Sequence, residues 1–133
     1  MKIAVDFDGT LCVHAFPHIG NDIGGCEVIK ALQKKGHKVY LYTMRSKQVL
    51  DEAIAWCRER GVTFDSINTD PGQWNWTTSP KCHADLYIDD AALGVPLEKG
   101  HVDWFKVTDY LVKYRIFTEQ EGKDIKNELA RFL

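Results

Sequence analysis

The amino-acid sequence predicts an α/β fold: a single Rossmann-like domain with a mainly parallel sheet and helices on both faces. Short apolar, β-branched runs alternate with segments of helical periodicity along the chain. The chain has 133 residues, of which 44% are hydrophobic and 27% charged, as in an ordinary folded domain with one core. We therefore expect one domain over residues 1–133.

The first part of the chain predicts two strands with a helix between them. Residues 2–7 are apolar and β-branched, which is typical of a short buried strand. The helix carries Ile29 and Leu32 on one face and stops at Gly36, where a left-handed residue can end it. Residues 37–42 predict the second strand.

A second helix and two further strands follow. Ser46 is suited to cap this helix and Gly61 to end it. Residues 62–67 and 86–88 predict the third and fourth strands. The apolar stripe of the helix consists of Leu50, Ala53, Ile54 and Cys57.

The C-terminal part predicts two more helices. Asp103 can cap the first, and residues 118–121 (Thr-Glu-Gln-Glu) have the form of a capping box for the second. The apolar positions of both helices recur at helical spacing, which indicates packing surfaces rather than cofactor contacts. These positions are Trp104, Val107 and Leu111, then Ile125, Leu129 and Phe132.

Charge and hydropathy restrict the partners. The formal net charge is −2. No basic excess favours a polyanion, which weakens nucleic acid as a partner without excluding it. No apolar stretch is long enough to cross a bilayer, and the N-terminus lacks the pattern of a signal peptide. We expect no membrane partner and a cytoplasmic location. The four cysteines agree with this location, because they are scattered, form no Cys-x-x-Cys pair and do not suggest a disulfide framework. A homo-oligomer is compatible with the sequence.

The most informative motif is Asp6-Phe7-Asp8-Gly9-Thr10-Leu11, directly after the first apolar run. Two carboxylates at the end of a buried strand cost desolvation energy unless a cation or hydrogen bonds compensate them. Strand alternation points residues 6 and 8 to the same side, and Gly9 permits a tight turn. Taken alone, Asp6 and Asp8 could form a solvated acidic turn. The polar residues at the ends of the other strands instead favour a functional site.

Polar residues follow two other strands, and the carboxyl ends of parallel strands meet at one edge of a sheet. Thr43 and Arg45 follow the second strand. Asp89 and Asp90 follow the fourth, with Lys81 just upstream of it. Four carboxylates in one crevice repel one another unless a divalent cation lies among them, and hard oxygen ligands favour Mg²⁺. A lysine and a hydroxyl opposite the metal suit a transferring phosphoryl group, for which a carboxylate can be the nucleophile.

This set of residues resembles the haloacid dehalogenase superfamily of phosphohydrolases. The resemblance rests on Asp-Phe-Asp-Gly-Thr-Leu at 6–11, Tyr-Thr-Met-Arg at 42–45, Lys81, and Tyr-Ile-Asp-Asp at 87–90. The four motifs stand in the family's order and cover the chain to about Pro96. The resemblance implies a small, capless phosphatase that hydrolyses phosphomonoesters with Mg²⁺ through an aspartyl-phosphate intermediate.

The resemblance also implies roles for individual residues. Asp6 would be the nucleophile that becomes phosphorylated. Asp8 would be the general acid and then the base, with its backbone carbonyl on the metal. Thr43 would donate a hydrogen bond to a phosphoryl oxygen, and Lys81 would neutralise the nucleophile and the phosphate.

Further residues complete the expected site. Asp89 would bind Mg²⁺, and Asp90 would bind it directly or through a water molecule, so the implied metal set is Asp6, Asp8, Asp89 and Asp90. Arg45 is a candidate second phosphate contact, because a guanidinium can bind two phosphate oxygens. Four other side chains could touch substrate, although the two tryptophans are better explained as anchors of the core or of their loop. These four are His14, His18, Trp74 and Trp76.

The expected substrate is a phosphorylated small molecule, and three other functions stay open. A degenerate relative could bind a partner without catalysis, but the acid, base, hydroxyl and lysine positions are intact. A phosphotransferase or nucleic-acid-end phosphatase would use the same chemistry. The absence of a strong basic excess in this chain argues against a polynucleotide substrate. A receiver-type signalling module has a similar acidic Mg²⁺ pocket, but its phosphorylated aspartate lies at a middle strand.

Overall fold

A computed structural model describes residues 1–133 and confirms an α/β fold built on a four-stranded parallel sheet. The sheet has the order β3-β2-β1-β4, so β1 is paired in parallel with both β2 and β4. The carboxyl ends of all four strands therefore lie at the same edge. The strands are β1 (Lys2–Val5), β2 (Lys38–Leu41), β3 (Ser66–Ile67) and β4 (Leu86–Ile88).

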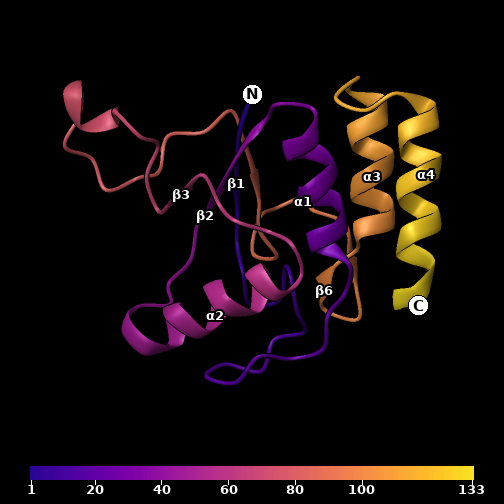
Figure 1. Cartoon of the computed structure of the whole chain (residues 1–133), viewed down its shortest axis with the longest axis horizontal. Helices are drawn as coiled ribbons and strands as arrows, with labels where there is room; N and C mark the ends of the chain where they lie inside the picture. Colours follow the sequence, from indigo (N-terminus) through magenta and orange to yellow (C-terminus); the bar gives the residue numbers. More distant parts are fainter.

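The four α-helices lie on one side of the sheet. Helix α1 (Gly25–Lys34) connects β1 to β2, and α2 (Lys47–Glu59) connects β2 to β3. Both crossovers step in the same direction across the sheet, so the usual right-handed connection places both helices on the same face. Helices α3 (Trp104–Lys113) and α4 (Glu119–Leu129) pack side by side next to α1 (Figure 1).

Side-chain alternation along the strands divides the apolar residues between the two faces. Ile3 and Val5 of β1 belong to one large core that includes side chains of all four α-helices. Ala4 and Tyr40 point to the other face and pack with Cys82. The segment between β3 and β4 covers that second face. It contains the one-turn 3-10 helix η1 (Gln73–Asn75) and no α-helix.

The expectation of helices on both faces therefore differs from the structure. A helix on the second face would have to lie in the crossover from β3 to β4, which runs the opposite way across the sheet. Residues 68–85 form this crossover and include Pro71 and Pro80, which interrupt a regular helix. Loop structure rather than an α-helix covers this face.

Most of the expected helix caps are present. Asp103 accepts a hydrogen bond from the backbone N–H of Lys106 at 3.1 Å. Thr118 and Glu121 form a complete capping box at the start of α4. Ser46 precedes α2, but its side chain makes no capping hydrogen bond.

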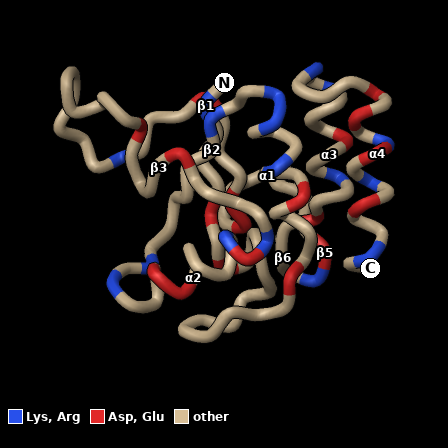
Figure 2. The backbone as a smooth tube through the Cα atoms, viewed as in Figure 1, with Lys and Arg blue, Asp and Glu red and all other residues tan.

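Smaller elements and strand lengths differ from the expectation. The first strand ends at Val5, so Asp6 and Asp8 lie in the loop that follows it. A hairpin of β5 (Leu97–Glu98) and β6 (His101–Val102) precedes α3, and the 3-10 helix η2 (Ala130–Phe132) ends the chain. No helix combines the length and the apolar character needed to span a bilayer. Basic and acidic positions are interspersed along the backbone (Figure 2).

Candidate active site

Three carboxylates converge where β1 and β4 end side by side. Asp6 directly follows β1, and Asp89 and Asp90 directly follow β4. Because these two strands are neighbours, their ends bring the three side chains together. One carboxylate oxygen from each residue lies within 4.8 Å of the others. This geometry agrees with the expectation that the strand ends share one crevice.

The electrostatics of the three carboxylates indicate a site that favours a cation. Burial raises the pKa of Asp6 to about 8, opposed by the hydrogen bond from Thr10 and reinforced by Asp89 and Asp90. Burial also raises the pKa of Asp89. A divalent cation among these oxygens would favour their ionised forms. Three carboxylates within reach of one point are the hard donors that Mg²⁺ prefers, so the residues present fit this ion.

Thr10 links the two strand ends. Its buried hydroxyl donates a hydrogen bond to Asp6 Oδ2 at 2.9 Å and accepts one from the backbone N–H of Asp90 at 3.1 Å. Its carbonyl accepts a hydrogen bond from Trp104 Nε1 at 2.6 Å, so α3 supports the turn. Thr10 is not among the site residues predicted from the sequence, although its place in the motif of residues 6–11 is a signal for it.

An open cleft of about 400 Å³ lies over these carboxylates. All the site residues predicted from the sequence line it except Lys81. His14 and Phe16 from the loop after β1, and Met44 after β2, form the remaining walls together with Ala91. Met44 is almost fully exposed and Phe16 about half exposed, so apolar surface borders the acidic floor of the cleft.

Asp8 is directed toward Arg45 rather than into the group of three carboxylates. Arg45 Nε donates to Asp8 Oδ2 at 2.8 Å, and Arg45 Nη2 donates to Asp8 Oδ1 at 2.7 Å. The Arg45 side chain is 0% exposed. The hydrogen bond to Asp8 raises the pKa of Arg45, so the guanidinium stays charged although it is buried. The Asp8 carboxylate therefore lies beside the group of three carboxylates, whereas the contact expected from Asp8 to the metal is through its backbone carbonyl.

The remaining donors of Arg45 bind backbone carbonyls. Nη1 donates to Pro17 O at 3.3 Å and to Val49 O at 3.1 Å, and Nη2 donates to His18 O at 2.9 Å. With the two bonds to Asp8, these interactions occupy all N–H groups of the guanidinium. A phosphate contact by Arg45, as expected from the sequence, would therefore require one of these hydrogen bonds to break.

Lys81 lies outside the cleft. Its ammonium is 5.6 Å from the centroid of the Tyr87 ring and has no hydrogen bond or ion pair with Asp6. Tyr87 packs against Ala4 and Tyr40 on the second face of the sheet, so the lysine lies over that face. The expected neutralisation of Asp6 is absent from this conformation.

Thr43 is held at the end of β2 with its hydroxyl at the cleft. Its backbone N–H donates to Asn68 Oδ1 at 2.8 Å, and its Oγ1 accepts from the backbone N–H of Arg45 at 3.1 Å. Its hydroxyl proton is therefore available to a ligand in the cleft. Of the two histidines in the preceding loop, His14 lines the cleft, whereas His18 contributes its carbonyl to Arg45.

The two tryptophans of the crossover neither line the cleft nor anchor their loop in the core. Trp74 is 55% exposed and Trp76 is 66% exposed, and both belong to or adjoin η1. The anchor is Gln73, whose fully buried side chain accepts from the backbone N–H groups of Asp70 at 2.8 Å and His83 at 3.1 Å. Anchoring of the loop in the core by these tryptophans is therefore not found, although Trp76 packs edge-on against His83 of the same crossover.

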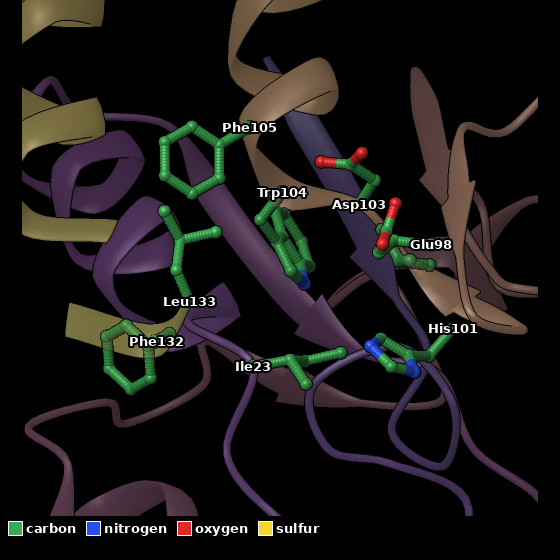
Figure 3. Close-up of a pocket in the computed structure, with 9 residues that line it drawn as sticks. Ile23, Glu98, His101, Asp103, Trp104, Phe105, Phe132 and Leu133 are labelled. Atoms are coloured by element: carbon green, nitrogen blue, oxygen red, sulfur yellow. The ribbon is translucent and has the colours of Figure 1, made fainter. Parts of the chain in front are cut away.

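A second hollow of about 300 Å³ lies between the β5–β6 hairpin, the start of α3 and the C-terminus (Figure 3). Ile23, Phe105 and Phe132 give it a mainly apolar lining. Trp104 also faces it, and its indole N–H binds the turn of the first motif. Since the clustered carboxylates lie elsewhere, the cleft over Asp6 is the candidate active site.

The fold and the site together define an α/β protein with an acidic cleft at the carboxyl ends of a parallel sheet. No protein-family model and no curated protein matches the chain. A solved structure of a conserved protein from Bacteroides thetaiotaomicron has 39% sequence identity and a TM-score of 0.74. The match covers 91% of this chain and 95% of that one. The chain belongs to the family of this conserved Bacteroides protein.

Proposed function

We propose that the protein is a Mg²⁺-dependent phosphomonoester hydrolase of the haloacid dehalogenase type that acts through a phosphorylated Asp6. The observation that carries this proposal is the convergence of Asp6, Asp89 and Asp90 in an open cleft. Asp8, which the motif pairs with Asp6, lines the same cleft. Nucleophile, acid and metal ligands are then within one site, as phosphoryl transfer requires.

The three converging carboxylates would hold the metal. When bound, Mg²⁺ supplies positive charge that neutralises these carboxylates and the oxygens of a phosphate. Thr10 orients the Asp6 carboxylate through its hydrogen bond to Oδ2. Thr43, which also lines the cleft, can donate its hydroxyl proton to a phosphoryl oxygen.

The reaction follows from the two aspartates of the first motif. An Asp6 oxygen attacks phosphorus, and the bond from phosphorus to the leaving oxygen breaks as the new bond forms. Asp8 gives its proton to that leaving oxygen. Asp8 then takes a proton from a water molecule that attacks the phosphorus of the aspartyl-phosphate. Inorganic phosphate leaves, and Asp6 is restored.

The proposed substrate is a phosphorylated small molecule. The cleft of about 400 Å³ is of the size that small ligands occupy. A polynucleotide would need a track of basic side chains, whereas basic and acidic positions are interspersed along this chain (Figure 2).

The test is phosphate release from a broad panel of phosphomonoesters, with Mg²⁺ and with EDTA. Wild type should release phosphate only with the metal, and Asp6→Asn should lose the activity by about 10³-fold or more, since no nucleophile remains. Asp51→Asn on the exposed face of α2 is the matched control and should retain full activity. Full activity of Asp6→Asn would refute the nucleophile. No release by wild type from any compound would instead favour a binding protein or a phosphotransferase.

A further inference from the structure

We propose that Arg45 is a positioning residue that holds the acid–base group Asp8 and the loop of residues 13–20 together, and that it does not bind phosphate. This inference rests on the proposed function, because it takes Asp8 as the proton donor. It assigns the arginine of the second motif a role in leaving-group protonation.

The surroundings of Arg45 hold its guanidinium in one place. The central carbon of the group lies 5.0 Å from the ring centroid of Phe7 and 5.1 Å from that of Phe16, so two aromatic rings contact it. The side chain is 0% exposed, and a buried charge is tolerated when it is paired and hydrogen-bonded. A swing toward a phosphate in the cleft would break several of these contacts at once.

The hydrogen bonds of Arg45 join three separate parts of the chain. Two of them grip both oxygens of Asp8 after β1. Two hold the carbonyls of Pro17 and His18 in the loop, and one holds Val49 in the first turns of α2. Because the fork is planar, it fixes the plane of the Asp8 carboxylate as well as its position.

The same contacts shape the wall that a leaving group would meet. Phe16 lines the cleft, and the carbonyl of the next residue, Pro17, is bound by Arg45. His14 lines the cleft from the same loop. The leaving group would therefore lie between this loop and Asp8, and the arginine sets the distance between the two.

The test compares substrates with good and poor leaving groups in Arg45→Lys, which keeps the charge and loses the fork. Release of 4-nitrophenolate needs no proton, whereas an alkoxide leaves only when it is protonated. We expect kcat/KM for an alkyl phosphate to fall by about 10²-fold and that for 4-nitrophenyl phosphate by only a few-fold. Arg60→Lys is the matched control, because Arg60 stacks on Trp56 away from the cleft. This variant should leave the ratio of the two kcat/KM values unchanged.

Inhibition by vanadate separates positioning from phosphate binding. A phosphate ligand would hold vanadate directly, so its loss would weaken vanadate inhibition strongly. We expect the inhibition constant of Arg45→Lys to stay within a few-fold of wild type. An equal loss of kcat/KM on both substrates, or strongly weakened vanadate inhibition, would overturn the inference. A wild type inactive on both substrates would instead refute the proposed function.

Two further measurements guard against a variant that fails to fold. In a crystal structure of wild type with Mg²⁺ and vanadate, the Arg45 fork should remain on Asp8. A guanidinium bound to the vanadate oxygens would overturn the inference without any variant. In an Asp8→Ala background, Arg45→Lys should cause no further change in the ratio of the two substrates, because the group that it positions is gone.

Discussion

Gly9 packs against the carboxylate of Asp90 so closely that a side-chain carbon at position 9 would overlap Asp90 Oδ2 and Cγ. Gly9 also has a φ of 78°, a left-handed conformation that costs other residues energy. The neighbouring Thr10 accepts a hydrogen bond from the backbone N–H of Asp90. The turn after β1 is thus shaped around the end of β4, and the first and last motifs form one unit.

Gly9→Ala should abolish the metal-dependent activity as well as reduce stability. The methyl group must displace Asp90, one of the three clustered carboxylates. Gly36→Ala is the control, because Gly36 has a similar φ of 93° with nothing near the added carbon. Both variants should lose about 1 to 2 kcal/mol in urea unfolding from backbone strain. Loss of Mg²⁺-dependent phosphate release in Gly9→Ala alone is the expected result, and equal activity of the two variants would contradict it.

The metal-free protein should lose stability as the pH rises, because of Asp6. Burial raises the pKa of Asp6 to about 8, above its ordinary value of 3.8 in an unfolded chain. The folded state therefore retains a proton that the unfolded state gives up. The contribution of protonated Asp6 to the free energy of unfolding is complete below about pH 4 and is lost as the pH rises through about 8.

Urea unfolding in EDTA measures this effect. Between about pH 5 and about pH 7, the unfolding free energy of wild type should fall by on the order of 2 kcal/mol more than that of Asp6→Asn. Saturating Mg²⁺ should stabilise wild type more at the higher pH, because the metal competes with the proton. Parallel pH dependences of wild type and Asp6→Asn would contradict the assignment to Asp6.

Lys81→Met should lower kcat/KM by about 10²-fold, although Lys81 lies outside the cleft. Its ammonium rests on the Tyr87 ring, and no carboxylate pairs with it. We expect this flexible side chain to turn toward the phosphate when substrate is bound. Lys99→Met, in the exposed turn of the β5–β6 hairpin, is the control and should keep wild-type activity. Unchanged activity of Lys81→Met would show that another group neutralises the phosphate.

The parts of the site that the sequence could predict are those with a local signal. Asp6 and Asp89 each directly follow a short apolar run, and the carboxyl ends of parallel strands meet at one edge. Thr43 was found in the same way at the end of β2. The capping residues Asp103 and Thr118 also depend on neighbours three positions away.

The missed features depend on contacts between distant residues. The bond from Arg45 to Asp8 spans 37 positions, and the bond from Trp104 to Thr10 spans 94. Neither leaves a pattern in the local sequence. Residue type also misled the assignment of the crossover, where polar Gln73 is buried and its neighbour Trp74 is exposed. The placement of α1 and α2 on one face follows from the strand order, which local patterns do not determine.

Substrates with a second anionic group should be poor substrates. The cleft contains the carboxylates of Asp6, Asp8, Asp89 and Asp90. Arg45 lines it but has no free donor, so His14 is the other side chain there able to carry positive charge. A bound Mg²⁺ would be engaged by the reacting phosphate, which leaves a second anion facing carboxylates and the apolar Phe16 and Met44.

The measurement compares glycerol 3-phosphate with 3-phosphoglycerate, which differ in the carboxylate carried by the leaving group. We expect kcat/KM to be at least about tenfold lower for the second compound, a penalty of about 1.4 kcal/mol in transition-state stabilisation. The ratio should shrink at high salt, because screening weakens repulsion between charges in an open cleft. Equal kcat/KM values at low salt would mean that a cation outside the cleft, such as Lys81, reaches the leaving group.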